Sequence, residues 1–337
     1  EDFFKMKKIV GILAVVAMTA SLFAADFAAA IQGYGDLFTI STAEGSKPQM
    51  LGWNDPWDRE FAWYSTGIGA SFTGDKAGLS FELDNRDVTV KNSKFWIQPL
   101  DMLKIQLGAN TIELAKETID YDGTVFTHGF EGWMFELKPV DGLTVQLGLE
   151  TGAPTGWSTN YWLGGKNYGP VADAEGKINM GQILATVAYG ADFGTVTALY
   201  NKAGDENTIA IDYAGNFGGV AVSPAFAYKT ASKAMAADLF VTANAAGVGI
   251  NVYGKFAKDG ADADPAVTVN TKFTYGTSIG QASLQIKDAN VLADAFAMMV
   301  KANLGFNCGS AGLDCGVQFD IADTVKISVP FQYNIHF

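Results

Sequence analysis

Apolar and polar residues alternate one by one along most of this chain. The pattern is clearest in residues 325–337, where every second position is Val325, Ile327, Val329, Phe331, Tyr333, Ile335 or Phe337. Because successive side chains of a β-strand point to opposite faces, such a segment predicts a strand with one apolar and one polar face. The same period recurs at residues 79–83, 103–109, 133–137, 143–149, 209–213, 248–252, 267–273 and 298–306.

The segments between these predicted strands are of two kinds, and the two kinds alternate. Short connections lie at residues 74–77, 99–102, 139–142, 192–194, 215–218, 244–247, 277–280 and 309–312. Connections that are often longer and more polar lie at residues 41–60, 84–92, 114–127, 151–181, 203–207, 229–233, 258–265 and 288–293. Short turns on one side and longer loops on the other are typical of β-barrels that cross a membrane.

The fold class predicted from this pattern is all-β, a transmembrane antiparallel up-and-down β-barrel. The segments predict about 16–18 strands, with 18 preferred and 16 if residues 79–84 and 94–98 do not form a full pair. No stretch after residue 24 is apolar for the roughly 18 residues that a membrane-spanning helix requires, so a helical membrane protein is excluded. Residues 25–337 are expected to form this barrel as a single domain.

The N-terminal residues have the features of a secretory signal peptide. Met6-Lys7-Lys8 is followed by an apolar run at residues 9–17 and then by small residues around Ala24. We expect cleavage after Ala24, so that residues 1–24 form the signal, and residues 1–5 precede the expected start at Met6. The alternative is an uncleaved anchor, although the apolar run is shorter than the roughly 20 residues that span a bilayer.

Charge and cysteine content exclude some functions. The net charge is −13, and residues 1–24 contribute +1 of it, so the remaining chain is near −14. Such an acidic chain does not suit nucleic acid, whose phosphates require basic surface. Cys308 and Cys315 have no accompanying cysteine pair or histidine cluster, so we expect no zinc, no other metal and no cofactor. In an oxidising compartment they are expected to form a disulfide, with two unpaired thiols as the alternative.

The C-terminal residues add a family resemblance. Phe331, Tyr333, Ile335 and the terminal Phe337 resemble the aromatic signal that bacterial barrel-assembly machinery reads. Together with the export signal, the even strand set and the asymmetric loops, they make the chain resemble bacterial outer-membrane porins over its whole length. Its lysine-rich, arginine-poor composition resembles a spirochaete-type surface porin. The resemblance implies the outer membrane of a diderm bacterium, contact with its lipid, and a homotrimer as one assembly.

A barrel of this size encloses a water-filled interior unless a plug fills it. The first predicted strand (residues 30–40) follows the signal closely, so no plug is expected. We therefore predict a porin for passive diffusion of ions and small polar solutes. The alternatives are a surface adhesin or structural protein with an occluded pore, and a transporter of hydrophobic compounds. His128 and His336 are the only histidines, and a solvated surface histidine is favoured over a general base, so no enzyme is predicted.

Strand parity predicts which charged side chains line the pore. The inward candidates are Glu82, Asp84, Lys104, Glu136, Glu150, Asp212, Asp238, Lys255, Lys272, Lys287, Lys301 and Lys326. The acidic ones lie on early and middle strands and most lysines on late strands, so an acidic wall is expected opposite a basic wall. The alternative is that these are ordinary hydrated residues without a role in selectivity.

The longest loop, residues 151–181, is rich in aromatic side chains. Trp157, Tyr161, Trp162 and Tyr168 lie there among glycines. Because exposed aromatic groups tend to pack against something, the loop is predicted to fold into the pore as a constriction. The alternatives are a cap on neighbouring loops or part of the aromatic girdle of the membrane interface.

Overall fold

The computed structural model describes residues 26–50, 64–84, 90–114, 119, 125–150, 171–172, 178–179, 182–288, 290–294 and 296–336. Every regular element in these residues is a β-strand. None of them belongs to a helix long and apolar enough to cross a membrane. The predicted signal peptide, residues 1–24, lies outside the described residues and stays a prediction.

Of the 21 strands in the described residues, all but three form a closed wall. The first nine wall strands are β1 (Asp26–Ser41), β3 (Tyr64–Thr73), β4 (Ala77–Asp84), β5 (Val90–Leu100), β6 (Leu103–Leu114), β7 (Phe126–Val140), β8 (Leu143–Glu150), β11 (Gln182–Ala191) and β12 (Gly194–Ala203). The others are β13 (Glu206–Phe217), β14 (Val220–Lys229), β15 (Met235–Ala245), β16 (Val248–Lys258), β17 (Ala266–Thr277), β18 (Gly280–Asp288), β19 (Met298–Cys308), β20 (Ala311–Ile321) and β21 (Val325–His336).

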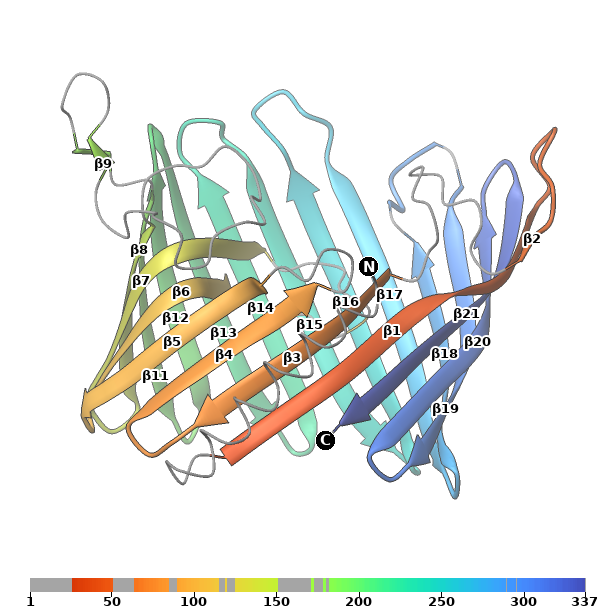
Figure 1. The fold of residues 1–337 in the computed structure, drawn as a ribbon. Coiled ribbons are helices and arrows are strands. Elements are labelled where there is room, and N and C mark those ends of the chain that lie inside the picture. The colour runs from red at the N-terminus through yellow and green to blue at the C-terminus, as the bar shows by residue number, and fades with distance from the viewer. Residues whose placement is uncertain are drawn as a thin grey trace.

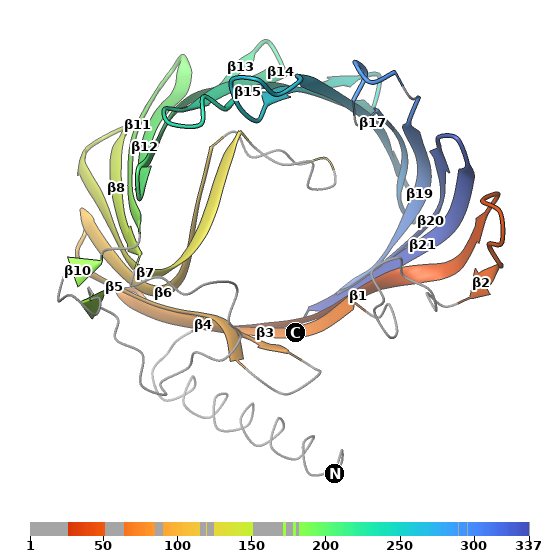
Figure 2. The same cartoon turned by 90° about the horizontal axis from the view of Figure 1, so that it is seen from above.

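The wall closes because the first strand pairs with the last. Each wall strand pairs antiparallel with the next along the chain, and β1 pairs with β3 on one side and β21 on the other (Figures 1 and 2). Ile31 is opposite Ile68 in one ladder and Ile335 in the other. Closure removes the open strand edges that would otherwise expose unpaired backbone groups. The predicted up-and-down β-barrel is confirmed, with 18 wall strands in the part of the chain that is described.

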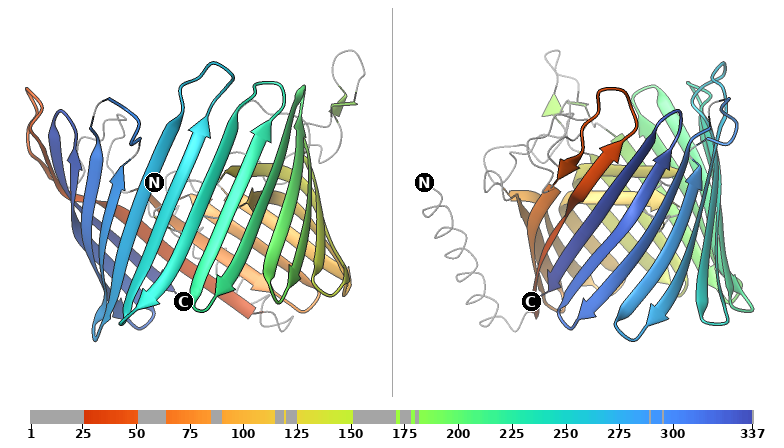
Figure 3. Two further views of the ribbon diagram at one scale, coloured as in Figure 1. Left: turned by 180° about the vertical axis from the view of Figure 1, so that it is seen from behind. Right: turned by 90° about the vertical axis from the view of Figure 1, so that its right-hand side faces the viewer.

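Tight turns join the strands at one end of the barrel. The β13–β14 turn, Gly218-Gly219, has φ values of 60° and 91°, and the β15–β16 turn, Ala246-Gly247, has 52° and 81°. Two consecutive positive φ values define the turn that matches the right-handed twist of paired strands. Connections at the other end include the longer loops, and all strands tilt in one sense between the two ends (Figure 3).

The two faces of the wall differ in polarity as the sequence pattern predicts. On β18, Leu284 is 41% exposed on the outer face while its neighbour Gln285 is 1% exposed on the inner face. The β6–β7 ladder follows the same alternation, because the polar Lys104 pairs with Glu136 and the apolar Ile105 pairs with Phe135.

The predicted C-terminal signal lies mostly on the outer face. Phe331 pairs with Cys315, and Tyr333 pairs with Leu313, which is exposed on the outer face. Ile335 has the same parity in β21. Phe337 lies outside the described residues.

The predicted disulfide is wrong, because both cysteines are free thiols. In the β19–β20 ladder Cys308 pairs with Ala311, whereas Cys315 pairs with Leu304. The two cysteines are therefore four residues apart along the strand direction, which is about 13 Å at the usual rise. A disulfide requires Cα atoms roughly 4.4–6.8 Å apart, so this hairpin register keeps the sulfur atoms out of reach.

We expect Leu284→Arg to destabilise the barrel by about 2–4 kcal/mol, because it places a charge on the lipid face near mid-strand. Ser283→Arg is the matched control, since Ser283 pairs with Thr274 and Asn303 on the inner face. Unfolding in urea from lipid vesicles measures both. Equal losses of stability would contradict the assignment of the two faces.

Alkylation of the folded protein without reduction, followed by unfolding in alkylating reagent, should add two groups, one each at Cys308 and Cys315. Intact mass spectrometry gives the count. If no alkyl group is added until the protein is reduced, the cysteines form a disulfide and the assignment as free thiols is wrong.

Candidate functional site

The outer halves of β6 and β7 leave the wall and cross the barrel interior. The β5–β6 ladder stops at the pair Lys94–Gly108, and the β7–β8 ladder stops at Gly132–Glu150. Beyond this line β6 and β7 continue to pair with each other as far as Leu114–Phe126. Figure 2 shows this β6–β7 hairpin, in yellow, reaching across the interior, where β6 contacts β13. We call residues 109–114 and 126–131 the inner hairpin.

Apolar packing holds the inner hairpin against the wall of β11–β14. One buried cluster joins residues of β6 and β7 to residues of that wall: Leu114, Phe126, Phe130, Met134, Leu184, Leu199, Ala210 and Ala227. Phe130 is 4% exposed and Leu184 is 0% exposed, although both face a barrel interior. Full burial of each large apolar side chain contributes about 1.5–3 kcal/mol. The alanines of β13 and β14 are small and leave room for the bulky side chains of the hairpin.

The opposite wall, on β15–β21 and β1, is polar on its inner face. Cross-strand partners share a face, so the ladders define rows of neighbouring inward side chains. One row is Tyr253, Asn270, Lys287, Met299, Asp320, Lys326 and Ser41. The next is Asn251, Lys272, Gln285, Lys301, Gln318, Ser328 and Thr39. We call these two rows, with the adjacent Lys255, the lysine band.

Acidic side chains accompany the lysines of this band. Asp238 pairs in register with Lys255, and Asp320 pairs with Lys326. Gln318 Nε2 donates a hydrogen bond of 2.9 Å to Asp320 Oδ1. Asp36, which the sequence analysis did not select, faces inward opposite Pro330, and its electrostatic neighbours are Lys326, Asp320 and Lys301. Charges of both signs therefore occur on this wall.

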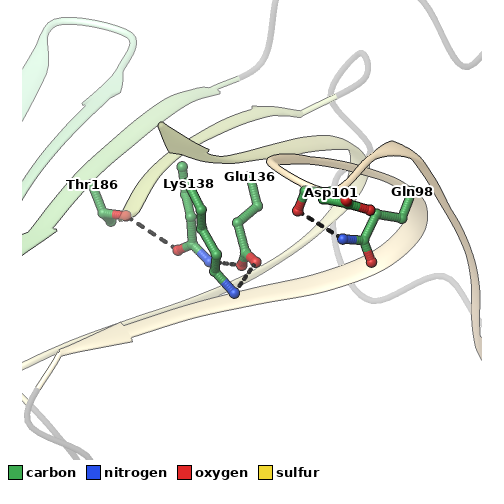
Figure 4. Close-up of polar contacts among 6 residues, drawn as sticks. Gln98, Asp101, Glu136, Lys138 and Thr186 are labelled. Carbon is green, nitrogen blue, oxygen red and sulfur yellow. Dashed lines mark hydrogen bonds and ion pairs between the residues drawn. The ribbon is translucent and has the colours of Figure 1, made fainter. Parts of the chain in front are cut away.

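The β5–β8 side of the interior carries a second mixed-charge group. Lys138 Nζ lies 3.0 Å from Glu136 Oε1, and Gln146 Nε2 donates a hydrogen bond of 2.9 Å to Glu136 Oε2. Thr186 Oγ1 in turn donates to Gln146 Oε1 at 3.1 Å, so the chain of contacts spans β7, β8 and β11 (Figure 4). Lys104 pairs in register with Glu136. The predicted acidic wall thus has lysines beside its central carboxylate.

Two further contacts occupy the tight-turn end of β5. Lys104 Nζ lies 4.6 Å from the centre of the Trp96 ring, within the range of a cation–π contact. In the β5–β6 turn, Gln98 Nε2 donates to the Asp101 carbonyl oxygen at 2.8 Å (Figure 4). The Lys76 ammonium donates to the Asp101 carboxylate and lowers the pKa of that carboxyl. Both side chains are exposed and the pair is screened by solvent, so it contributes little to stability.

The remaining predicted site residues are placed as follows. Asp212 faces inward between Thr197 and Ala225, and Glu150 pairs with Gly132 at the base of the inner hairpin. Glu82 and Asp84 belong to β4, but their side chains lie outside the described set. The predicted constriction residues Trp157, Tyr161, Trp162 and Tyr168 lie outside the described residues altogether.

The long loop does contribute one described ribbon. Its two short strands, β9 (Val171–Ala172) and β10 (Ile178–Asn179), pair only with each other within the described residues. Figure 1 shows β9 beyond the rim of the wall near β8. Among the described residues, the segment that crosses the interior is the inner hairpin, of which the sequence analysis placed only the part within residues 114–127 in an outer loop. The constriction predicted for residues 151–181 stays a prediction.

A sequence signal for the inner hairpin existed. Inward positions of β6 and β7 begin polar, with Lys104 and Glu136, and become apolar at Leu114, Phe126 and Phe130. An apolar residue at an inward position of a water-filled barrel has to be covered, which predicts that the segment packs inside.

No group of three or more His, Cys, Asp or Glu side chains arranged to hold a metal ion occurs among the described residues. The polar side chains that line the interior carry amines, carboxylates, amides and hydroxyls.

Solved structures share this architecture at low sequence identity. OpdQ of Pseudomonas aeruginosa superposes with a TM-score of 0.56 at 10% identity, covering 93% of this chain and 97% of that one. The outer membrane protein OpdK of Pseudomonas aeruginosa has a TM-score of 0.55 at 8% identity, covering 93% and 99%. OccAB4 of Acinetobacter baumannii has 0.54 at 9% identity, covering 92% and 98%. No protein-family model and no curated protein sequence matches the chain. These likenesses show the barrel fold.

We expect a charged, water-soluble thiol reagent to label Lys272→Cys in the lysine band much faster than Leu199→Cys under the inner hairpin. Leu199 is 3% exposed because the hairpin covers it. Both variants need Cys308→Ser and Cys315→Ser to remove the native thiols. Equal labelling rates would contradict the division of the interior into an apolar wall under the inner hairpin and a polar wall lined by lysines.

Proposed function

We propose that this protein is an outer-membrane porin, a channel for passive diffusion of ions and small polar solutes. The lysine band supports the proposal most directly. It spans β16–β21 and β1 at mid-strand and lies on the inner face of a closed barrel whose outer face is apolar. Amines, amides and hydroxyls form hydrogen bonds with water and polar solutes. Covering these rows with apolar groups would cost free energy, because their hydrogen bonds to water would be lost.

Selectivity by charge should be modest. Asp238 and Asp320 accompany Lys255 and Lys326, so the field of each lysine is partly cancelled at its own position. Lys272 and Lys301 lie on either side of the neutral Gln285 in adjacent strands, so two positive charges act together there. These two lysines are therefore the best candidates for setting the sign of ion preference.

The alternatives predict other interiors. A transporter of hydrophobic compounds requires an uncovered apolar path, whereas the apolar cluster of the interior is buried under the inner hairpin. An adhesin requires loops that occlude the pore, and conductance separates that reading from a porin.

The expected partners follow from the same proposal. Lipid would contact the outer face, and the barrel-assembly machinery would read Phe331, Tyr333 and Ile335, which share that face. The homotrimer and the spirochaete-type relationship stay predictions.

Purified, folded barrels should conduct in a planar lipid bilayer. The folded state is checked by its resistance to unfolding in detergent without heating. If folded barrels give no conductance, the adhesin alternative replaces the porin proposal.

Lys272→Glu combined with Lys301→Glu should shift the reversal potential in a salt gradient toward cations. The control is Lys229→Glu, because Lys229 is the exposed last residue of β14 at the loop end. The difference should be largest at low salt, since the Debye length falls from about 30 Å at 0.01 M to about 3 Å at 1 M. Equal shifts for both changes would exclude a selectivity role for the lysine band.

A further inference from the structure

The inner hairpin is seated on a glycine of the wall. Gly148 of β8 faces inward between Met134 and Leu184, and the Phe130 ring lies over it. A Cβ atom at Gly148 would come within 2.7 Å of Phe130 Cζ and within 3.4 Å of two further ring atoms. The ring therefore occupies the space that any larger residue at position 148 would fill.

The base of the hairpin is built for a sharp bend. Gly108 and Gly132 face each other in the β6–β7 ladder, at the line where both neighbouring ladders stop. A side chain at Gly108 would overlap the Ser93 carbonyl oxygen, and one at Gly132 would overlap that of Leu149. Gly108 also has a φ of 111°, which side chains rarely allow.

Asn110 braces this bend. Its Nδ2 donates hydrogen bonds to the carbonyl oxygens of Gly108, at 2.9 Å, and Gly132, at 3.1 Å. One buried side chain thus connects the two strands of the hinge at the point where they leave the wall. The brace and the glycine seat lie side by side, since Asn110 pairs with Phe130, whose ring covers Gly148.

We propose that the Phe130–Gly148 seat and the Asn110-braced glycine hinge set the position of the inner hairpin and thereby the size limit for solutes. The inference rests on the proposed porin function. None of these five residues (Phe130, Gly148, Asn110, Gly108 and Gly132) lies in the lysine band, so they act as positioning residues.

Leverage makes the seat effective. Phe130 lies two residues beyond Gly132, while the hairpin extends six residues beyond Gly108 to Leu114. At about 3.3 Å per residue the ring is about 7 Å from the hinge and the end of β6 about 20 Å. A displacement at the ring is therefore magnified roughly threefold at that end by rigid rotation of the hairpin.

The direction of the effect follows from the geometry. A larger residue at position 148 lifts the ring off the β8 wall and rotates the hairpin toward the lysine band on the opposite side. Gly148→Leu should therefore lower single-channel conductance and reduce the largest polyethylene glycol that enters the pore. Gly254→Leu is the matched control, because a Cβ there meets nothing within 4 Å and Gly254 pairs with Leu239 on the outer face.

The companion variant reverses the change. Phe130→Ala combined with Gly148→Leu exchanges large and small across the same contact, and should restore the conductance and size limit of the unmodified protein. A merely destabilised barrel would not recover by losing a second buried side chain. Unchanged conductance in Gly148→Leu, or a change that Phe130→Ala does not reverse, would overturn the proposal.

A second measurement applies even where Gly148→Leu does not fold or the barrel does not conduct. Leu114→Cys, in the background without Cys308 and Cys315, reports the docked hairpin because Leu114 is buried in the apolar cluster. Adding Asn110→Ala should speed its labelling by a charged thiol reagent about tenfold or more, because a buried hydrogen-bonding group is lost. Adding Asn303→Ala, on the inner face far from the hairpin in strand order, should leave the rate unchanged.

The two proposals then fail separately. Absence of conductance with the predicted labelling pattern would remove the porin function and keep the hairpin device. Conductance with equal labelling rates for Asn110→Ala and Asn303→Ala would keep the porin and remove the device.

Discussion

Pairing of every backbone N–H and C=O group is the constraint on which this structure depends. A strand wall in a bilayer has no water to satisfy an open edge, so a sheet crosses only when it closes on itself. Here the closure is the β1–β21 ladder, which joins residues near the two ends of the described chain. Each of the other ladders connects strands that follow one another along the chain. Closing the barrel thus needs one pairing between strands that are distant in sequence, β1 with β21. The alternation of polar and apolar residues along the strands is consistent with the closed barrel.

The inner hairpin is the exception, and its chemistry is different. Where β6 and β7 leave the wall they remain paired with each other, and apolar packing replaces the neighbouring ladders as the source of stability. Phe130, Leu114 and Met134 are withdrawn from water inside a barrel whose other inward positions are mainly polar. Gly108, Gly132 and Asn110 at the base allow the two strands to bend away from the barrel wall while they stay paired with each other. A barrel interior can therefore hold a small hydrophobic core on one side and a hydrated surface on the other.

Which charged side chains are neighbours in the interior depends on strand pairing more than on strand order. Inward acids and lysines that are far apart in sequence become electrostatic neighbours, as Asp36 and Lys326 do. Cross-strand pairs of opposite sign stabilise a sheet modestly and cancel much of each other's field at a distance. This arrangement favours a wall that is polar and hydrated over one with a strong net field. Lys272 and Lys301 lie on either side of Gln285, which places two positive charges close together at mid-strand.

The alternation of residues by itself determined the strands, their faces, the side on which turns and loops lie, and the inward position of residues such as Lys104 and Asp238. These properties are local, because parity along a strand needs no knowledge of its neighbours. The β19–β20 register was needed to show that Cys308 and Cys315 are too far apart to form a disulfide. Their spacing in sequence does not give this distance, because it depends on where the turn lies between them. The apolar inward positions Leu114, Phe126 and Phe130 mark the inner hairpin in the sequence, but only the tertiary structure decided which wall it packs against. That choice depends on Phe130 meeting Gly148 and on small side chains of β13 lying opposite the hairpin, and neither contact can be read from one strand alone.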